Sequence, residues 1–241
     1  MDRQSRCIKT IYKYKNIEIG LPGPVFGGET EIYMPPLGYS IDIFTLKKKL
    51  MNLNISVDIC NDCKLLHKIA RRLPKRNIFK DDRGFQNDSG SICISIGTSF
   101  GINGITRSGC SISLEMAHIL WFHLIPSQTK ITKDIDFYKC TISDVLNSSY
   151  ILSSLRECNS SEEIYDLGES LCEALLSSAQ MTASLLGINK FQIIVVTGIY
   201  LQIENLLQKA NIKNLTAKCA KGLTILSICP QEHLSTSRSL S

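Results

Sequence analysis

Two short stretches of the chain contain the residue types that can hold a phosphate group. The stretch ISIGTSFG interrupts a β-rich segment at Gly97, Thr98 and Ser99, and the stretch IIVVTGIYLQIENLL turns at Gly198 between an apolar strand and a helix. A glycine lets the backbone approach a phosphate closely, and nearby N–H and hydroxyl groups can donate hydrogen bonds to it. The same residues are common in ordinary turns, so either stretch taken singly predicts only a turn.

Three other residues, Cys60, Cys63 and His67, have side chains that bind zinc, and they are spaced as Cys-x2-Cys-x3-His. Structural zinc sites almost always have four ligands, and the neighbouring sequence offers no fourth. The pattern therefore favours ordinary buried thiols and leaves zinc as the alternative.

The segment 67–80 contains six lysines and arginines. Such a run can contact RNA or an acidic partner, but it is more typical of the solvated face of a helix and its following loop. We therefore expect no nucleic-acid partner.

The composition is that of a globular protein: the 241 residues are 44% hydrophobic and 20% charged, with a mild net charge of +5. No apolar run reaches the roughly 18–20 residues that span a bilayer, and the polar start does not resemble a secretory signal. The ten cysteines are expected to be reduced thiols that serve as small apolar side chains. These features predict a cytoplasmic protein without a membrane partner.

Patterns of apolar and polar residues predict the elements that position these side chains. In the first part of the chain, glycine and proline turns separate short strands and helices. The expected strands are 7–14, one beginning near residue 16, 30–34 and 55–60, and the expected helices are 45–51 and 63–73. The polar segment 75–90 is expected to be a loop and a domain boundary.

The second part begins with the strand at Ser91 and a further strand or loop over 102–112. Apolar and amphipathic patterns then predict helices at 114–124, 142–155, 161–186, 201–210 and 214–228. The third of these starts with acidic residues, which suit the helix dipole, and ends at Gly187. The continuous apolar run FQIIVVT, before Gly198, is typical of a strand buried on both faces.

This order gives two α/β halves, each opened by antiparallel strands, and it resembles the layout of the actin/Hsp70/sugar-kinase (ASKHA) superfamily. We expect a reduced N-terminal lobe at 1–88, an ATP-binding-type lobe with a helical dimerisation region at 89–234, and a disordered tail at 235–241. In proteins of this layout ATP lies between the lobes. The resemblance implies ATP-binding roles for Gly97, Thr98, Ser99 and Gly198.

The chain also resembles the eukaryotic-type (type II) pantothenate kinases. ICISIGTSFGI stands where that family has a strand followed by Ile-Gly-Ser-Gly, and SGCSISLEMAHIL stands where it has Gly-Thr-Ser-Leu, three glycines and an apolar helix. The likeness continues through SAQMTASLLGINKFQIIVVTGIYLQIENLL. The resemblance implies ATP and Mg²⁺ as cofactors, and transfer of the γ-phosphoryl group to the hydroxyl of pantothenate, the first step of coenzyme A synthesis.

The chain departs from this family at several loops. The strand ISVDIC runs into Asn-Asp-Cys where the family has three glycines, and the carboxylate of Glu115 stands where a phosphate should approach. The family's catalytic glutamate has no counterpart, which leaves Asp58 and Asp62 as the nearby candidates for a general base. Arg107 is the basic residue nearest to the family's substrate-contacting arginine.

Two functions follow from the resemblance, and they differ in whether the protein is active. One is a divergent pantothenate kinase, and the other is an inactive relative that acts as a structural or regulatory subunit. Members of the family dimerise through their helical C-terminal half, so 161–186 and 114–124 are the expected interface of a homodimer or of a heterodimer with a related kinase. An unrelated α/β interaction module is a third alternative.

Overall fold

The computed structural model of the chain describes residues 16–23, 25, 31–34, 38–72, 76–80, 90–114, 116–124, 136, 138–210 and 220–227. The chain divides into two compact units, Met1–Leu65 and Leu66–Ser241. The sequence placed the boundary at 88/89 instead. The division differs because β5 (Arg76–Lys80) pairs with β10 (Ala220–Ser227) in the sheet of the second unit. The strand expected at 7–14 and the tail expected at 235–241 lie outside the described residues.

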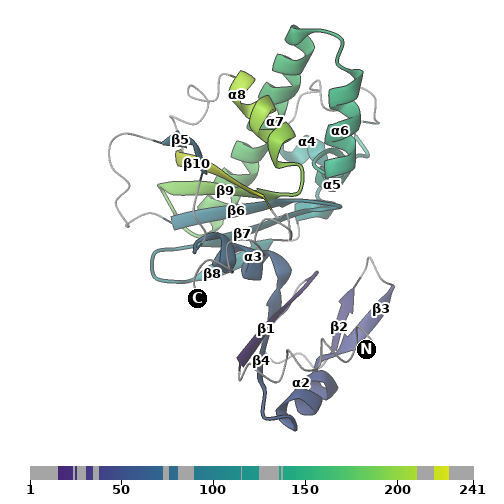
Figure 1. Ribbon diagram of the computed structural model, residues 1–241, viewed down its shortest axis with the longest axis vertical. Coiled ribbons are helices and arrows are strands. Elements are labelled where there is room, and N and C mark those ends of the chain that lie inside the picture. Colours follow the sequence, from purple (N-terminus) through teal and green to yellow (C-terminus); the bar gives the residue numbers. More distant parts are fainter. Residues whose placement is uncertain are drawn as a thin grey trace, which may run out of the picture. The chain divides into compact units, whose positions relative to one another are not determined.

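The described residues of the first unit include two small sheets, the helix α2 and the beginning of α3 (Figure 1). The strands β1 (Asn16–Leu21) and β4 (Ser56–Asn61) pair in parallel, and β2 (Glu31–Met34) and β3 (Tyr39–Asp42) pair antiparallel. The helix α2 (Ile43–Met51) begins where the Oδ1 atom of Asp42 accepts a hydrogen bond from the Thr45 N–H at 2.8 Å. Leu21, Ile43 and Ile59 form a small core beneath it.

The second unit is built on a six-stranded sheet with the order β5-β10-β9-β6-β7-β8 (Figure 1). Its remaining strands are β6 (Gly90–Ile96), β7 (Phe100–Ile105), β8 (Ser111–Leu114) and β9 (Phe191–Thr197). The neighbours β10, β9 and β6 run parallel to one another, whereas β5, β7 and β8 pair antiparallel with their neighbours. The carboxyl ends of the three parallel strands therefore lie next to one another, and we call this the carboxyl edge of the sheet.

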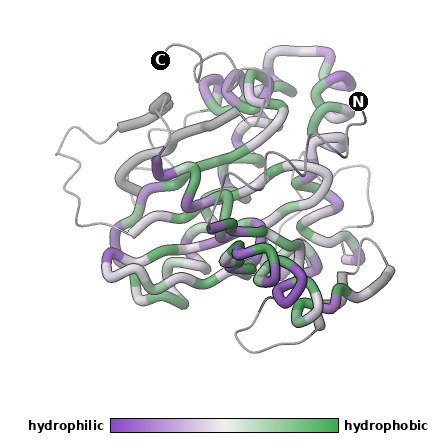
Figure 2. The backbone as a smooth tube through the Cα atoms, turned by 60° about the horizontal axis from the view of Figure 1, so that its bottom comes forward, coloured by the Kyte–Doolittle hydropathy of each residue, from purple (hydrophilic) through white to green (hydrophobic). Residues whose placement is uncertain are grey.

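Seven further helical segments complete the described chain. They are α3 (Asp62–Ala70), η2 (Met116–His118), α4 (Trp121–Leu124), α5 (Ile142–Val145), α6 (Ser148–Glu157), α7 (Ser161–Leu185) and α8 (Tyr200–Lys209). The helices α7 and α8 lie over one face of the sheet (Figure 1). In Figure 2 hydrophobic and hydrophilic stretches alternate along the helical turns, as expected of helices with one buried side.

The two faces of the sheet bury alternate residues of the central strands. Ile92, Ile94 and Ile96 join the main core together with residues of α7, while Cys93 and Ile194 pack with Ala70 of α3 on the other face. Every residue of β9 is buried, which confirms the strand buried on both faces that its apolar run predicts. Burial also raises the pKa of the Cys93 thiol to about 12, because a thiolate there would be desolvated.

Several predicted elements are wrong. Of the helix expected at 214–228, the described residues 220–227 form the strand β10, and the expected loop 75–90 contains β5. These two strands pair with each other, and β10 also extends β9 in parallel, so contacts from outside the segments decide their structure. The helix expected at 114–124 is divided between the end of β8, the 3₁₀ turn η2 and the short helix α4, and the helix expected at 142–155 is interrupted between α5 and α6.

His67 is buried within the second unit and holds α3 to the sheet. Its Nε2 lies 2.8 Å from the Ser91 hydroxyl, and its Nδ1 lies 2.7 Å from the amide nitrogen of Asn103. The Asn103 Oδ1 in turn accepts a hydrogen bond from the Ser113 hydroxyl at 2.8 Å. Replacing this imidazole would leave a cavity and deprive buried polar groups of a partner.

We therefore expect His67→Ala to lower the free energy of unfolding by roughly 2–4 kcal/mol, as measured by urea denaturation. Ser113→Ala removes only the last bond of the chain and should lower it by about 1 kcal/mol. Equal, small effects of both variants would show that the histidine does not anchor α3.

Candidate functional site

The sheet places the two glycine turns expected from the sequence side by side. Because β6 and β9 are parallel neighbours with Ile96 opposite Thr197, Gly97 and Gly198 each follow a paired residue at the same edge. This is the edge where parallel α/β sheets bind their ligands. We call Gly97, Thr98 and Ser99 the phosphate turn.

The phosphate turn is tight and open to solvent. The Gly97 N–H donates to the Ser99 carbonyl at 3.0 Å, and Thr98 and Ser99 are exposed. A Cβ built on Gly97 or on Gly198 would meet no atom within 4 Å, and neither glycine has a positive φ. The fold itself therefore does not require glycine at either position, whereas close approach of a ligand to the backbone would.

The start of α8 adds donors to this edge. Its N-cap residue, Ile199, offers no side-chain hydrogen bond to the first turn, and the Thr197 hydroxyl accepts the Ile199 N–H at 3.2 Å. The first N–H groups of a helix lack intrahelical partners and carry partial positive charge, so they favour an anion. The edge that holds Gly97 and Gly198 is thus suited to phosphate.

The sequence missed the residues that hold the phosphate turn in place. The Ser148 N–H donates to the Gly97 carbonyl at 2.8 Å, the Ser148 hydroxyl donates to the Ile96 carbonyl at 3.4 Å, and the hydroxyls of Ser99 and Ser143 lie 3.0 Å apart. Ser143 and Ser148 stand more than forty residues later in the chain, and no local pattern connects them to the turn.

In the first unit, Asp62 is the better placed of the two candidate bases. It is the half-buried first residue of α3 and directly follows the carboxyl end of β4, where β1 also ends. Asp58, in contrast, is an exposed residue within β4 whose register partner is Glu18. Only Asp62 therefore lies at a strand end, the position at which parallel sheets place functional side chains.

Close packing and hydrogen bonds fix the backbone around Asp62. A Cβ on Gly20 would lie 2.9 Å from the Asp62 Cα, so only glycine lets β1 approach α3 so closely. The side chain of Asn61 donates to the Gly23 carbonyl at 2.8 Å and accepts the Cys63 N–H at 3.0 Å. These contacts fix the backbone of Asp62 at the strand end, and with it the place from which its carboxylate projects.

Arg107 lies away from the phosphate turn. It belongs to the turn between β7 and β8, which is closed by a hydrogen bond from the Thr106 N–H to the Cys110 carbonyl at 2.8 Å. The phosphate turn precedes β7 and Arg107 follows it, so the two lie at opposite ends of that strand. The substrate-binding role that the resemblance implied for Arg107 therefore has no support from its position in the sheet.

The residues considered for zinc have other contacts. Both ring nitrogens of His67 meet Ser91 and Asn103, and the Cys60 thiol donates to Glu18 Oε1 at 3.6 Å. Within the described part of the chain, no three His, Cys, Asp or Glu side chains are grouped so that they could hold a metal ion.

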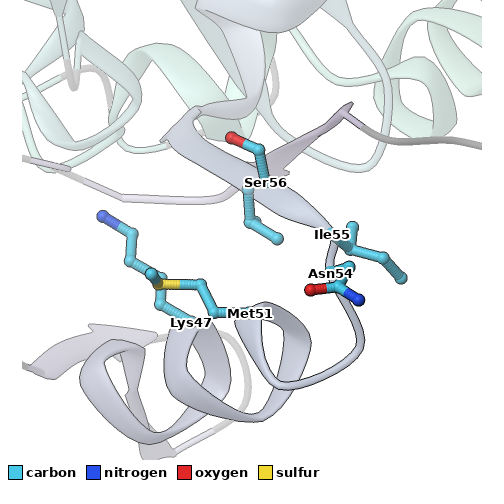
Figure 3. A pocket seen from close by; sticks show the side chains of 6 residues that line it. Lys47, Met51, Asn54, Ile55 and Ser56 are labelled. Atoms are coloured by element: carbon cyan, nitrogen blue, oxygen red, sulfur yellow. The ribbon is translucent and has the colours of Figure 1, made fainter.

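A cavity of about 290 Å³ in the first unit is lined by Lys47, Met51, Asn54, Ile55, Ser56 and Val57. Figure 3 shows it between α2 and the beginning of β4. It therefore lies at the amino end of β4, whereas Asp62 follows the carboxyl end.

Searches with the sequence against protein-family models and curated proteins give no match. Solved structures do match, and glucokinases are among them. A glucokinase from an Antarctic psychrotroph has a TM-score of 0.60 at 14% identity, covering 92% of this chain and 79% of that chain. The glucokinase of Leishmania braziliensis gives 0.55 at 12%, covering 89% and 72%. A ROK-family protein from Streptococcus pneumoniae, in complex with sucrose, gives 0.53 at 13%, covering 92% and 78%.

The chain thus shares the mixed α/β fold of these sugar kinases, which confirms the α/β fold class expected from the sequence. The pantothenate kinase family is not among these three neighbours. None of the helices in the described ranges is long and apolar enough to cross a membrane.

Proposed function

We propose that this protein is an ATP-dependent phosphotransferase whose acceptor is the hydroxyl of a sugar. The observation that supports this most directly is the adjacency of Gly97 and Gly198 at the carboxyl edge of the β6–β9 pair, with open space at both glycines. Two open glycines that the backbone conformation does not need are explained by a ligand that approaches the backbone.

In this proposal the second unit binds the nucleotide. The phosphate turn and Gly198 hold the phosphates of ATP, and the N-terminus of α8 faces the same anion. In the first unit, Asp62 is the candidate general base, because it is the carboxylate at the end of β4 and is partly accessible. ATP supplies the phosphoryl group, and Mg²⁺ bound to its phosphates would neutralise their charge.

A sugar is preferred over pantothenate as the acceptor. The three structures compared above are glucokinases or a protein solved with sucrose. Pantothenate was implied only by the resemblance of short stretches, and its expected contact, Arg107, lies at the far end of β7 from the phosphate turn. Pantothenate remains the alternative acceptor.

The test is a coupled assay of ADP release from Mg-ATP with glucose, mannose, fructose and pantothenate as separate acceptors. We expect turnover with at least one sugar and a rise in melting temperature with Mg-ATP. Turnover with pantothenate alone would overturn the sugar assignment. Absence of both a thermal shift and turnover would overturn the kinase proposal and favour the inactive subunit.

The apolar faces expected to form a dimer are largely used within the chain. Residues such as Leu171, Leu175 and Ala179 of α7 are buried in the main core, as is Trp121. Met181 and Leu185 are among the exposed apolar residues of α7. The dimer stays a proposal, with this part of α7 as its candidate contact, and light scattering of the purified protein tests it.

A further inference from the structure

The segment 141–148, which we call the corner between α5 and α6, places a hydroxyl against the phosphate turn. Ser143 of α5 lies with its Oγ 3.0 Å from the Ser99 Oγ, and Ser148, the first residue of α6, donates its N–H to the Gly97 carbonyl at 2.8 Å. Both ends of the phosphate turn therefore contact the same corner.

The corner is rigid for reasons that the sequence makes clear. Thr141 and Asp144 form a reciprocal capping box at the start of α5, and Ile142, Val145 and Leu146 are fully buried beneath it. The side chain of Asn147 donates to the Ser143 carbonyl at 2.8 Å and accepts the Tyr150 N–H at 2.8 Å. The backbone of Ser143 is thus fixed by hydrogen bonds and by the core, and its hydroxyl lies against that of Ser99.

A hydroxyl has one proton to donate and two lone pairs to accept with, and this decides the direction of the Ser99–Ser143 bond when phosphate is present. A phosphate oxygen accepts hydrogen bonds, so Ser99 must direct its proton to the phosphate. Ser143 must then donate to Ser99. Donation by Ser143 also polarises the Ser99 hydroxyl and strengthens its bond to the anion.

We propose that Ser143 is a positioning residue that orients the Ser99 hydroxyl toward a nucleotide phosphate. The inference rests on the proposed function, because it takes the phosphate turn as the nucleotide site. Ser143 itself does not need to touch the nucleotide, and its effect passes through Ser99. It is a role that neither the sequence patterns nor the fold comparisons assign.

The test measures nucleotide affinity directly, by isothermal titration of the full-length protein with a non-hydrolysable ATP analogue and Mg²⁺. Ser143→Ala should raise the dissociation constant about three- to tenfold, the effect expected for one lost hydrogen bond. Ser143→Thr keeps the hydroxyl and should restore binding. Ser153→Ala removes an exposed hydroxyl that is bonded only along α6, to Glu157, and should leave affinity unchanged.

A double-mutant cycle separates positioning from a general structural role. If Ser143 acts through Ser99, the Ser99→Ala/Ser143→Ala pair should bind no more weakly than Ser99→Ala alone. Fully additive effects, or wild-type affinity in Ser143→Ala, would overturn the positioning role while leaving the kinase proposal intact. A wild-type protein that binds no nucleotide would overturn the proposed function, and this inference with it.

Discussion

Asp62→Asn should reduce the rate of phosphoryl transfer by about 10²–10⁴-fold, the contribution typical of a general base. Asparagine has nearly the same shape as aspartate, but its amide cannot take a proton from the acceptor hydroxyl. Its Oδ1 can still accept the Cys63 N–H, as Asp62 does at 2.7 Å, so the start of α3 should be preserved. The measurement is kcat in the coupled assay, with nucleotide affinity by titration expected to be unchanged.

Asp58→Asn is the matched control, because it makes the same chemical change four residues earlier, within β4, the strand that Asp62 directly follows. Asp58 is exposed within β4, away from the strand end, so its replacement should leave kcat close to the wild-type value. Full activity of Asp62→Asn, or an equal loss in both variants, would contradict the assignment of Asp62 as the base.

The phosphate turn could be predicted from the sequence because its signal is local. An apolar strand followed by Gly97, Thr98 and Ser99 predicts both the strand end and the turn, and the strand β9 before Gly198 gives the same signal. That both turns lie on one edge follows once the two strands are parallel neighbours. The sequence supplies the turns, and the pairing of β6 with β9 joins them.

The site around Asp62 could be predicted only in part. The sequence marks Asp62 as a nearby carboxylate, but its position depends on Gly20, Gly23 and Asn61, which are brought together by the parallel pairing of β1 with β4. Nothing local to Asp62 signals that Gly20 is needed some forty residues earlier. Ser143 was missed for the same reason, since its contact with Ser99 spans a sequence separation of 44 residues.

The wrong prediction for β10 and the zinc alternative considered for His67 share a physical cause. The predicted helix 214–228 contains alanines and lysines that suit a helix, but in its part that forms β10, parallel pairing with β9 and antiparallel pairing with β5 select a strand. His67 was considered as a metal ligand because its spacing from Cys60 and Cys63 suits zinc. Its neighbours in space, Ser91 and Asn103, come from β6 and β7, and they give it a structural role instead.

Gly97→Ala should weaken nucleotide binding by about ten- to a hundredfold while leaving the melting temperature unchanged. A methyl group at this position meets no protein atom within 4 Å and the backbone needs no positive φ, so the free protein should accept it. In the complex, the methyl group would stand where a phosphate approaches the turn. The loss of one charge-assisted hydrogen bond, worth about 1.5–3 kcal/mol, accounts for an effect of this size.

Gly187→Ala provides the opposite outcome under the same measurements. Gly187 is also open, with no atom within 4 Å of a built Cβ, but its φ of +63° is a conformation that alanine adopts only with strain. Replacement there should lower the free energy of unfolding by roughly 1–2 kcal/mol and leave nucleotide affinity unchanged. The phosphate site is supported if Gly97→Ala affects binding alone and Gly187→Ala affects stability alone. If Gly97→Ala instead destabilises the protein and binds nucleotide normally, Gly97 is a folding residue and the phosphate turn is only a turn.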